Sequence, residues 1–127
     1  MDNKNDTIKN TDDCIFCKIA NKEIKPDIVE ESENFIAFPD IHPKKPGHTL
    51  IIPKRHYENI LELPNILAGE LFLAIKKVAD KSFREGAEGF NIVVNSGKSA
   101  GQVVPHLHFH LVPRKSNDGG LFSGKDF

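Results

Sequence analysis

Three histidines alternate with apolar residues in the segment PHLHFHLVPR, which spans residues 105–114. Side chains two positions apart along a β-strand point to the same face of a sheet. We therefore predict a strand over residues 106–112 in which His106, His108 and His110 share one face. The apolar residues between them would point to the other face, into the hydrophobic core. One short strand would thus supply both a core and a row of three imidazoles.

The rest of the chain predicts an α+β fold. Short β-branched and aromatic runs separated by Ser, Asn, Pro and Gly indicate strands, and apolar residues at steps of three and four indicate a long helix. The expected order is a short helix at 14–20, strands at 28–32, 35–40 and 48–53, a helix at 64–86, and strands at 90–95 and 106–112. We expect both helices on one face of a mainly antiparallel sheet, which leaves the other face for chemistry.

The composition fits one globular domain. A chain of 127 residues is long enough for a single hydrophobic core. Its 17 basic and 18 acidic residues nearly cancel, so we expect neither a nucleic acid nor an anionic membrane as partner. There is no run of eighteen apolar residues and no apolar segment near the start. We therefore expect a cytoplasmic protein in which residues 1–13 form a polar tail.

The shared face of histidines has three possible uses. It could be a solvated polar surface, a metal site built from imidazoles two residues apart, or a site of covalent catalysis. Neutral imidazole is a capable nucleophile near pH 7, because its ordinary pKa is about 6.5. The preceding loop SGKSAGQ could bind a phosphate through its backbone N–H groups. It is not a P-loop, because Ile92 stands where a P-loop needs glycine and a strand is expected where a P-loop needs a helix.

The only two cysteines, Cys14 and Cys17, form a C-x-x-C pair. In a reducing compartment such a pair favours metal binding or redox chemistry over a structural disulfide. Free thiols are a further alternative. A thioredoxin-like redox site would follow a strand, and none is expected before this pair.

The histidine-rich segment resembles the signature of the histidine triad (HIT) superfamily, in particular its Hint-like branch. The segments CIFCKIANKEI, FIAFPDIHPKKPGHTLIIPKRH and NIVVNSGKSAGQ occur in the family's order, so the resemblance covers residues 14–115, which we expect to form the domain, followed by a tail at 116–127. The resemblance implies the HIT fold, with a five-stranded mainly antiparallel sheet and two helices per subunit, and a ten-stranded sheet across a homodimer.

The resemblance also implies an enzyme that acts at the α-phosphate of a purine nucleotide such as AMP or GMP. The implied reaction is hydrolysis of a purine nucleoside 5′-phosphoramidate or another AMP conjugate through a covalent nucleotidyl-histidine. A dinucleoside polyphosphate hydrolase, or a nucleotide-binding interaction protein with little turnover, are the alternatives.

Roles for individual residues follow from the same resemblance. His108 matches the nucleophile, His110 the residue that contacts the phosphate and assists the leaving group, and His48 a further site histidine. Asp40 matches the carboxylate that binds ribose hydroxyls. The other implied nucleotide-binding residues are Ile15, Phe16, Ile19, Phe38 and Ile41 around the base, and Asn95, Gly101, Gln102 and Val103 around the phosphate and leaving group. Val103 departs from the pattern, because many members of the Hint branch have serine there.

Some members of the superfamily bind zinc, and the matching residues here are Cys14, Cys17, His56 and His106. Two thiolates and two imidazoles suit a closed, tetrahedral Zn²⁺ site of structural type. The resemblance thus implies structural zinc and a reaction that needs no metal.

Overall fold

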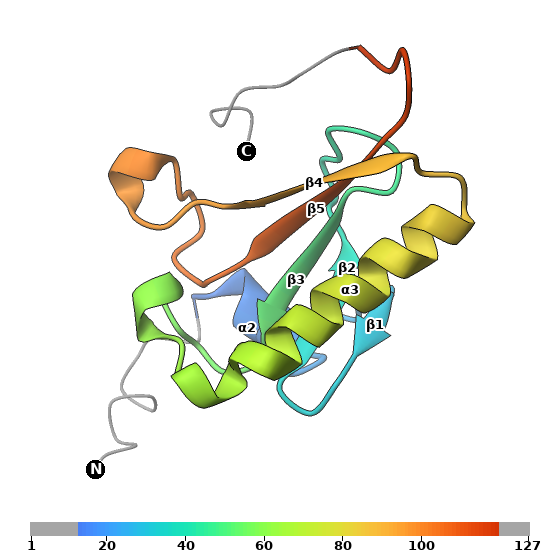
Figure 1. The fold of residues 1–127 in the computed structure, drawn as a ribbon. Helices are drawn as coiled ribbons and strands as arrows, with labels where there is room; N and C mark the ends of the chain where they lie inside the picture. The colour runs from blue at the N-terminus through green and yellow to red at the C-terminus, as the bar shows by residue number, and fades with distance from the viewer. Residues whose placement is uncertain (1–12, 120–127) are drawn as a thin grey trace.

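The computed structural model describes residues 13–119 and contains a five-stranded antiparallel sheet in the order β1-β2-β3-β5-β4 (Figure 1). The strands are β1 (Glu30–Glu31), β2 (Phe35–Pro39), β3 (Thr49–Pro53), β4 (Gly89–Val94) and β5 (Phe109–Arg114). The helices are α2 (Ile15–Ala20) and α3 (Ala68–Arg84), with short 3-10 turns η1 (Ile60–Glu62), η2 (Asn65–Leu67) and η3 (Lys98–Ala100). The predicted α+β architecture and order of elements are confirmed.

One face of the sheet packs against α3 and forms the main core. Leu107, Phe109 and Leu111 are buried in this core, as their alternation with the histidines predicts. They join Phe35, Ala37 and Ile51 from the sheet and Leu71, Ala74, Ile75 and Val78 from the helix. The apolar stripe that marks residues 64–86 as helical is therefore the surface by which α3 covers the sheet.

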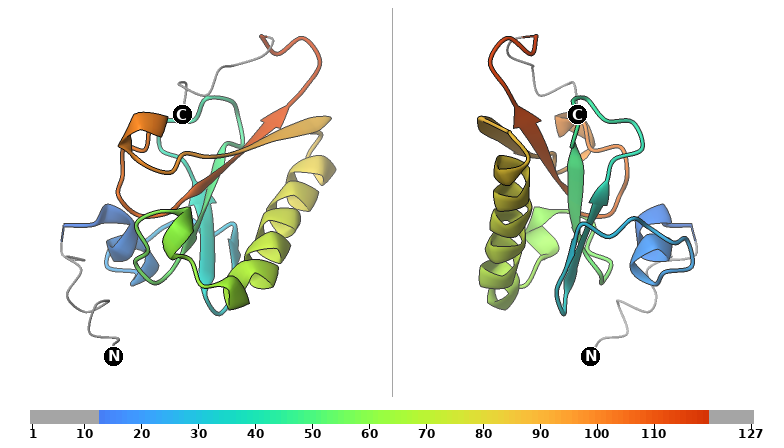
Figure 2. Two further views of the ribbon diagram at one scale, coloured as in Figure 1. Left: turned by 60° about the vertical axis from the view of Figure 1, so that its left-hand side comes forward. Right: turned by 90° about the vertical axis from the view of Figure 1, so that its right-hand side faces the viewer.

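The opposite face of the sheet packs against α2. Figure 2 shows α2 and α3 on opposite sides of the sheet, so our expectation that both helices cover one face is wrong. The reason lies in β2 and β3, whose consecutive residues are apolar and buried on both sides. Side chains such as Ile36, Leu50 and Ile52 need a cover of their own, which Phe16, Cys17 and Ile19 of α2 provide.

The strand predicted at 106–112 begins later than expected. β5 starts at Phe109, and the chain before it is extended but pairs elsewhere. The N–H of Leu107 donates to the carbonyl of Tyr57 at 2.7 Å, and that of His106 donates to Val104 at 2.8 Å. These bonds replace the strand ladder without reversing the alternation of side chains, so His106 and His108 still face away from the main core.

Both expected tails lie largely outside the described residues. Of residues 1–13, only Asp13 is described, and it is exposed. Of residues 116–127, the described part forms a turn in which both Asp118 carboxylate oxygens accept hydrogen bonds from Arg114, each at 2.8 Å. Within residues 13–119, no helix has the length and apolar character needed to cross a membrane.

Truncating the core side of β5 should destabilise the fold strongly. We expect Leu111→Ala to lower the free energy of unfolding by about 2–5 kcal/mol, because its side chain is fully buried and alanine leaves a cavity. The matched control is Leu61→Ala, at a site 90% exposed, which should change stability by less than about 0.5 kcal/mol. Urea unfolding followed by circular dichroism measures both variants, and equal losses would contradict this assignment of the core.

Candidate active site

A cavity of about 740 Å³ opens on the face of the sheet that α2 covers. That volume lies within the usual range for sites that bind small molecules. It brings together most of the residues predicted to form a site, namely Ile15, Phe16, Ile19, Phe38, Asp40, Ile41, His48, Gly101, Val103, His108 and His110. The cavity is apolar near α2, where the rings of Phe16 and Phe38 pack edge to face with their centroids 5.9 Å apart. It is polar where the histidines lie.

Strand register explains why the histidines reach this cavity. His110 on β5 lies opposite Leu50 on β3, which lies opposite Phe38 on β2. These three positions form a row on the α2 face of the sheet. His48 and Asp40 lie at the adjoining ends of β3 and β2, where the Asp40 N–H donates to the His48 carbonyl at 3.0 Å.

The tautomer of His108 follows from its hydrogen bond. Nδ1 of His108 lies 2.8 Å from the carbonyl oxygen of His106, which can only accept. The proton of the neutral ring is therefore on Nδ1, and Nε2 carries the lone pair. Burial lowers the pKa of His108, so the ring is neutral near pH 7. The lone pair on Nε2 makes His108 a competent nucleophile.

His110 and His48 form a second, directly bonded pair. Nδ1 of His110 lies 2.9 Å from Nε2 of His48, and Oδ2 of Asp40 lies 3.5 Å from the same His48 nitrogen. Burial, and then the neighbouring His108 and His48, lower the pKa of His110 to about 4. Burial also lowers the pKa of His48, although Asp40 opposes that shift. Both rings are therefore neutral at physiological pH.

A separate cluster joins the cysteine pair to two histidines. The ligand atoms of Cys14, Cys17, His56 and His106 all lie within 4.8 Å of one another, close enough to hold one metal ion. Nδ1 of His106 lies 3.2 Å from the Cys14 sulfur, and Nδ1 of His56 lies 3.2 Å from the Cys17 sulfur. Both cysteines are buried.

The chemistry of this cluster fits a metal. Nε2 of His106 donates to the Pro53 carbonyl at 2.9 Å, so its Nδ1 lone pair faces the sulfurs, as a metal ligand requires. Burial, with smaller effects from Cys14, raises the pKa of the Cys17 thiol to about 12. Without a metal this thiol is protonated, and a bound cation would displace the proton. The Cys14 sulfur also accepts from the Cys17 N–H at 3.3 Å, capping α2.

Two predicted residues, Asn95 and Gln102, are not among those lining the cavity. Gln102 instead braces the loop between β4 and β5. Its side-chain oxygen accepts from the Gly97 N–H at 2.8 Å, and its NH₂ group donates to the carbonyls of Glu58 and Val104 at 2.6 and 3.0 Å. Gln102 therefore holds the loop that brings Gly101 and Val103 to the cavity.

The cavity also has lining residues that sequence reasoning missed. They include Lys44, Val104 and the segment from Ile24 to Asp27, which follows α2. That segment has no strand or helix periodicity, and its one signal is the turn residues Pro26 and Asp27. Such a signal predicts a loop but does not show where the loop packs.

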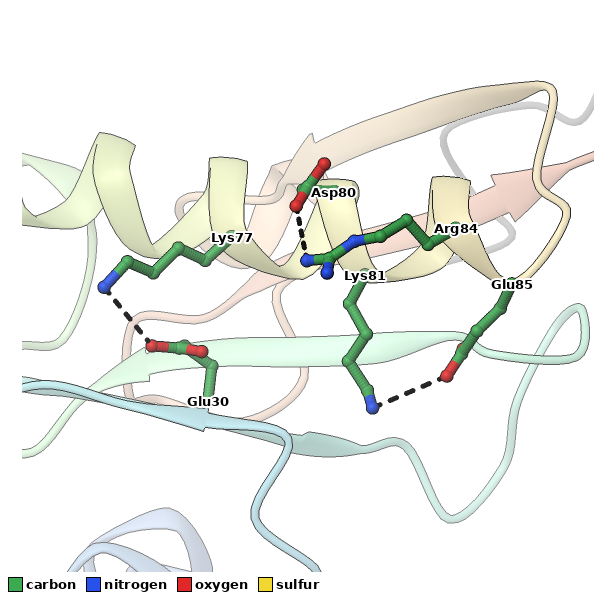
Figure 3. Close-up of a pocket in the computed structure, with 6 residues that line it drawn as sticks. All are labelled: Glu30, Lys77, Asp80, Lys81, Arg84 and Glu85. Carbon is green, nitrogen blue, oxygen red and sulfur yellow. Dashed lines mark hydrogen bonds and ion pairs between the residues drawn. The ribbon is translucent and has the colours of Figure 1, made fainter.

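A second hollow, between α3 and β1, is a less suitable site (Figure 3). Its charged side chains pair with one another: Lys77 with Glu30 at 3.7 Å, Lys81 with Glu85 at 3.5 Å, and Arg84 with Asp80. Exposed pairs of this kind contribute little energy. Because the two signs of charge cancel locally, this hollow has no preference for an anionic ligand.

The sequence of this chain is similar to those of known proteins of one family. The HIT domain family matches residues 21–117. An uncharacterised HIT-like protein of Methanocaldococcus jannaschii is 46% identical over 106 residues, which cover 84% of this chain and 82% of that protein. An adenosine 5′-monophosphoramidase of Schizosaccharomyces pombe is 37% identical over 111 residues, or 87% and 81% of the two chains.

A solved structure shows the same fold. The crystal structure of a HIT family protein from Bacillus anthracis superposes with a TM-score of 0.79 at 41% identity, covering 88% of this chain and 82% of that one. The family membership that the sequence resemblance predicted is thereby confirmed. The chain belongs to the HIT family, as a Hint-like protein.

Proposed function

We propose that this protein hydrolyses purine nucleoside 5′-phosphoramidates or related AMP conjugates at the α-phosphate. The observation that carries the proposal is the unprotonated Nε2 of His108 in a cavity that is apolar at one end and lined by histidines at the other. A nucleotide has matching parts, a flat base and a charged phosphate. The activity named for the Schizosaccharomyces pombe relative supports the same reaction.

The reaction takes two steps. Nε2 of His108 attacks the α-phosphorus and the bond to the leaving group breaks, so the leaving group departs with the bonding electrons and takes up a proton from solvent. Water then attacks the phosphorus of the nucleotidyl-histidine and breaks the P–N bond, which releases the nucleotide, restores neutral His108 and returns one proton from the water to solvent. His110 donates a hydrogen bond to the phosphoryl group, whereas the N–H groups of Ala100, Gly101 and Gln102 already donate to carbonyls within their loop.

The nucleoside would lie along the apolar part of the cavity. Phe16, Phe38 and the isoleucines around them, Ile15, Ile19 and Ile41, would contact the base. Asp40 would accept hydrogen bonds from ribose hydroxyls, for which a carboxylate is suited. Its Oδ1 already accepts from the His42 N–H at 3.0 Å, which orients the carboxylate. Residues 14–115 would form this nucleotide-binding domain.

Replacing the nucleophile tests the reaction. We expect His108→Asn to lower kcat at least roughly a thousandfold and to change AMP affinity only a few-fold, because the nucleophile acts in the transition state. Activity is measured on adenosine phosphoramidates and on dinucleoside polyphosphates, which also separates the two substrate classes. The wild-type reaction should be stopped rapidly without acid, because acid cleaves the P–N bond. Mass spectrometry should then detect a nucleotidyl adduct on His108. Retained turnover in His108→Asn would refute the proposed nucleophile.

We propose that the cluster of Cys14, Cys17, His56 and His106 binds structural zinc. The burial of both cysteines and the fixed tautomer of His106 support this assignment. When bound, zinc would tie α2 to the segment that precedes β5. The catalytic steps above use no metal.

Removing one metal ligand tests the zinc site. We expect His56→Gln to lower the zinc content from about one ion per chain to a small fraction of that, and to lower the Tm by several degrees, because metal binding energy contributes to folding. His42→Gln is the matched control, since His42 is exposed and outside the cluster, and it should retain zinc. Elemental analysis and calorimetry measure both; equal zinc contents in the two variants would exclude the site.

We further propose a homodimer with a ten-stranded sheet. Within the described residues β4 pairs only with β5, so its other edge can pair with a second copy. Ile92 on β4 is 53% exposed and Leu73 on α3 is 51% exposed, which leaves apolar surface uncovered in a single chain. Sedimentation equilibrium should show a dimer for the wild type and for Ile66→Glu, and a monomer for Ile92→Glu. A monomeric wild type at tens of micromolar would contradict the proposal.

A further inference from the structure

His48, which lines the cavity together with His108 and His110, accepts a hydrogen bond from the backbone. The N–H of Lys44 donates to Nδ1 of His48 at 3.0 Å. His48 is only 1% exposed, so water does not compete freely for this nitrogen. The donor is part of a compact turn in which the His48 N–H donates to the Lys45 carbonyl at 3.0 Å and Gly47 adopts a φ of +87°.

This bond determines where the proton of His48 lies. A backbone amide can donate but cannot accept, so Nδ1 of His48 must carry its lone pair. The neutral ring then has its proton on Nε2. Nδ1 of His110 lies 2.9 Å from that nitrogen, whereas Oδ2 of Asp40 is farther away at 3.5 Å. His48 therefore donates to His110.

The tautomer of His110 follows in turn. Because its Nδ1 accepts from His48, the neutral ring carries its own proton on Nε2. Adding a second proton at Nδ1 would set two N–H groups against each other at 2.9 Å. His48 could relieve that clash only by moving its proton to Nδ1, which breaks the bond from Lys44. The arrangement thus favours a neutral His110 that donates from Nε2.

The tautomers of His48 and His110 also disfavour a metal at this point. Asp40, His48 and His110 have ligand atoms within 4.8 Å of one another and could in principle hold a cation. A metal on His48 Nε2 would need a lone pair there, but that nitrogen bears the proton. Binding would therefore require His48 to lose its bond from Lys44.

We propose that the backbone N–H of Lys44 is a positioning group that, through His48, fixes His110 as a neutral Nε2–H donor. The inference rests on the proposed function for its catalytic consequence, which is a donor aimed at the phosphoryl group in a fixed protonation state. His108, His48, Asp40 and Lys44 are the titratable groups whose charges act on His110. The Lys44 side chain is not needed for this role, because only its amide takes part.

The test compares variants that remove or keep this amide. Lys44→Pro removes the N–H, whereas Lys44→Ala keeps it and loses only the side chain. A third protein, made by chemical ligation, replaces the Lys44 amide nitrogen by an ester oxygen and so removes the donor without the ring of proline. Nitrogen NMR of protein labelled in histidine reports directly which ring nitrogen of His110 is protonated.

We expect wild type and Lys44→Ala to show His110 protonated at Nε2 alone. In Lys44→Pro and in the ester, His48 is free to adopt either tautomer, so His110 should become a mixture with protonated Nδ1. We expect kcat to fall roughly threefold to tenfold in these two proteins, since only part of the population holds the productive tautomer, with AMP affinity changed less.

Unchanged His110 resonances in the ester protein would overturn the proposal, as would protonated Nδ1 in the wild type. If circular dichroism shows that Lys44→Pro does not fold, the tautomer of His110 in the ester protein is the test. The tautomer of His110 is measured without substrate, so this test does not depend on the hydrolase activity. If His108→Asn retained turnover, the proposed function would fail while the NMR result still tested this inference.

Discussion

The extended segment from His106 to Leu111 is a constraint on which both the core and the site depend. Its alternate side chains face opposite ways, so the leucines and the phenylalanine join the core beneath α3 while the histidines face α2. Because the segment lies between two layers, its imidazoles are desolvated, and burial is the first cause of the lowered pKa of His108 and His110. The fold itself therefore keeps these rings neutral and able to act as nucleophile or donor.

The cluster of Cys14, Cys17, His56 and His106 and the cavity share this segment. His106 faces the cysteine sulfurs through its ring, and its carbonyl accepts the Nδ1 proton of His108 at 2.8 Å. Phe16, which lies between the two cysteines, packs edge to face against His108 with ring centres 5.1 Å apart. A metal that fixes Cys14, Cys17 and His106 would thus also fix the neighbours of His108. A structural ion at this place can support catalysis without taking part in it.

Local sequence patterns predicted the elements and their order, because periodicity is a local property. The alternation at 106–111 and the apolar stripe of α3 were both visible in the residues. The position of α2 was not, since a six-residue helix has too short a pattern to show which face of the sheet it covers. The late start of β5 depends on the remote partner Tyr57, and the bracing role of Gln102 depends on Glu58. Such contacts between distant residues leave no periodic signal.

In the proposed mechanism, His108 carries the nucleotidyl group between two displacements. The stereochemical course at phosphorus tests it most directly. A single diastereomer of an adenosine 5′-phosphorothioate substrate is hydrolysed in isotopically labelled water, and the configuration of the product is determined by phosphorus NMR. Two in-line displacements invert the centre twice, so we expect net retention of configuration at phosphorus. Net inversion would show a single direct attack by water and would contradict a covalent role for His108.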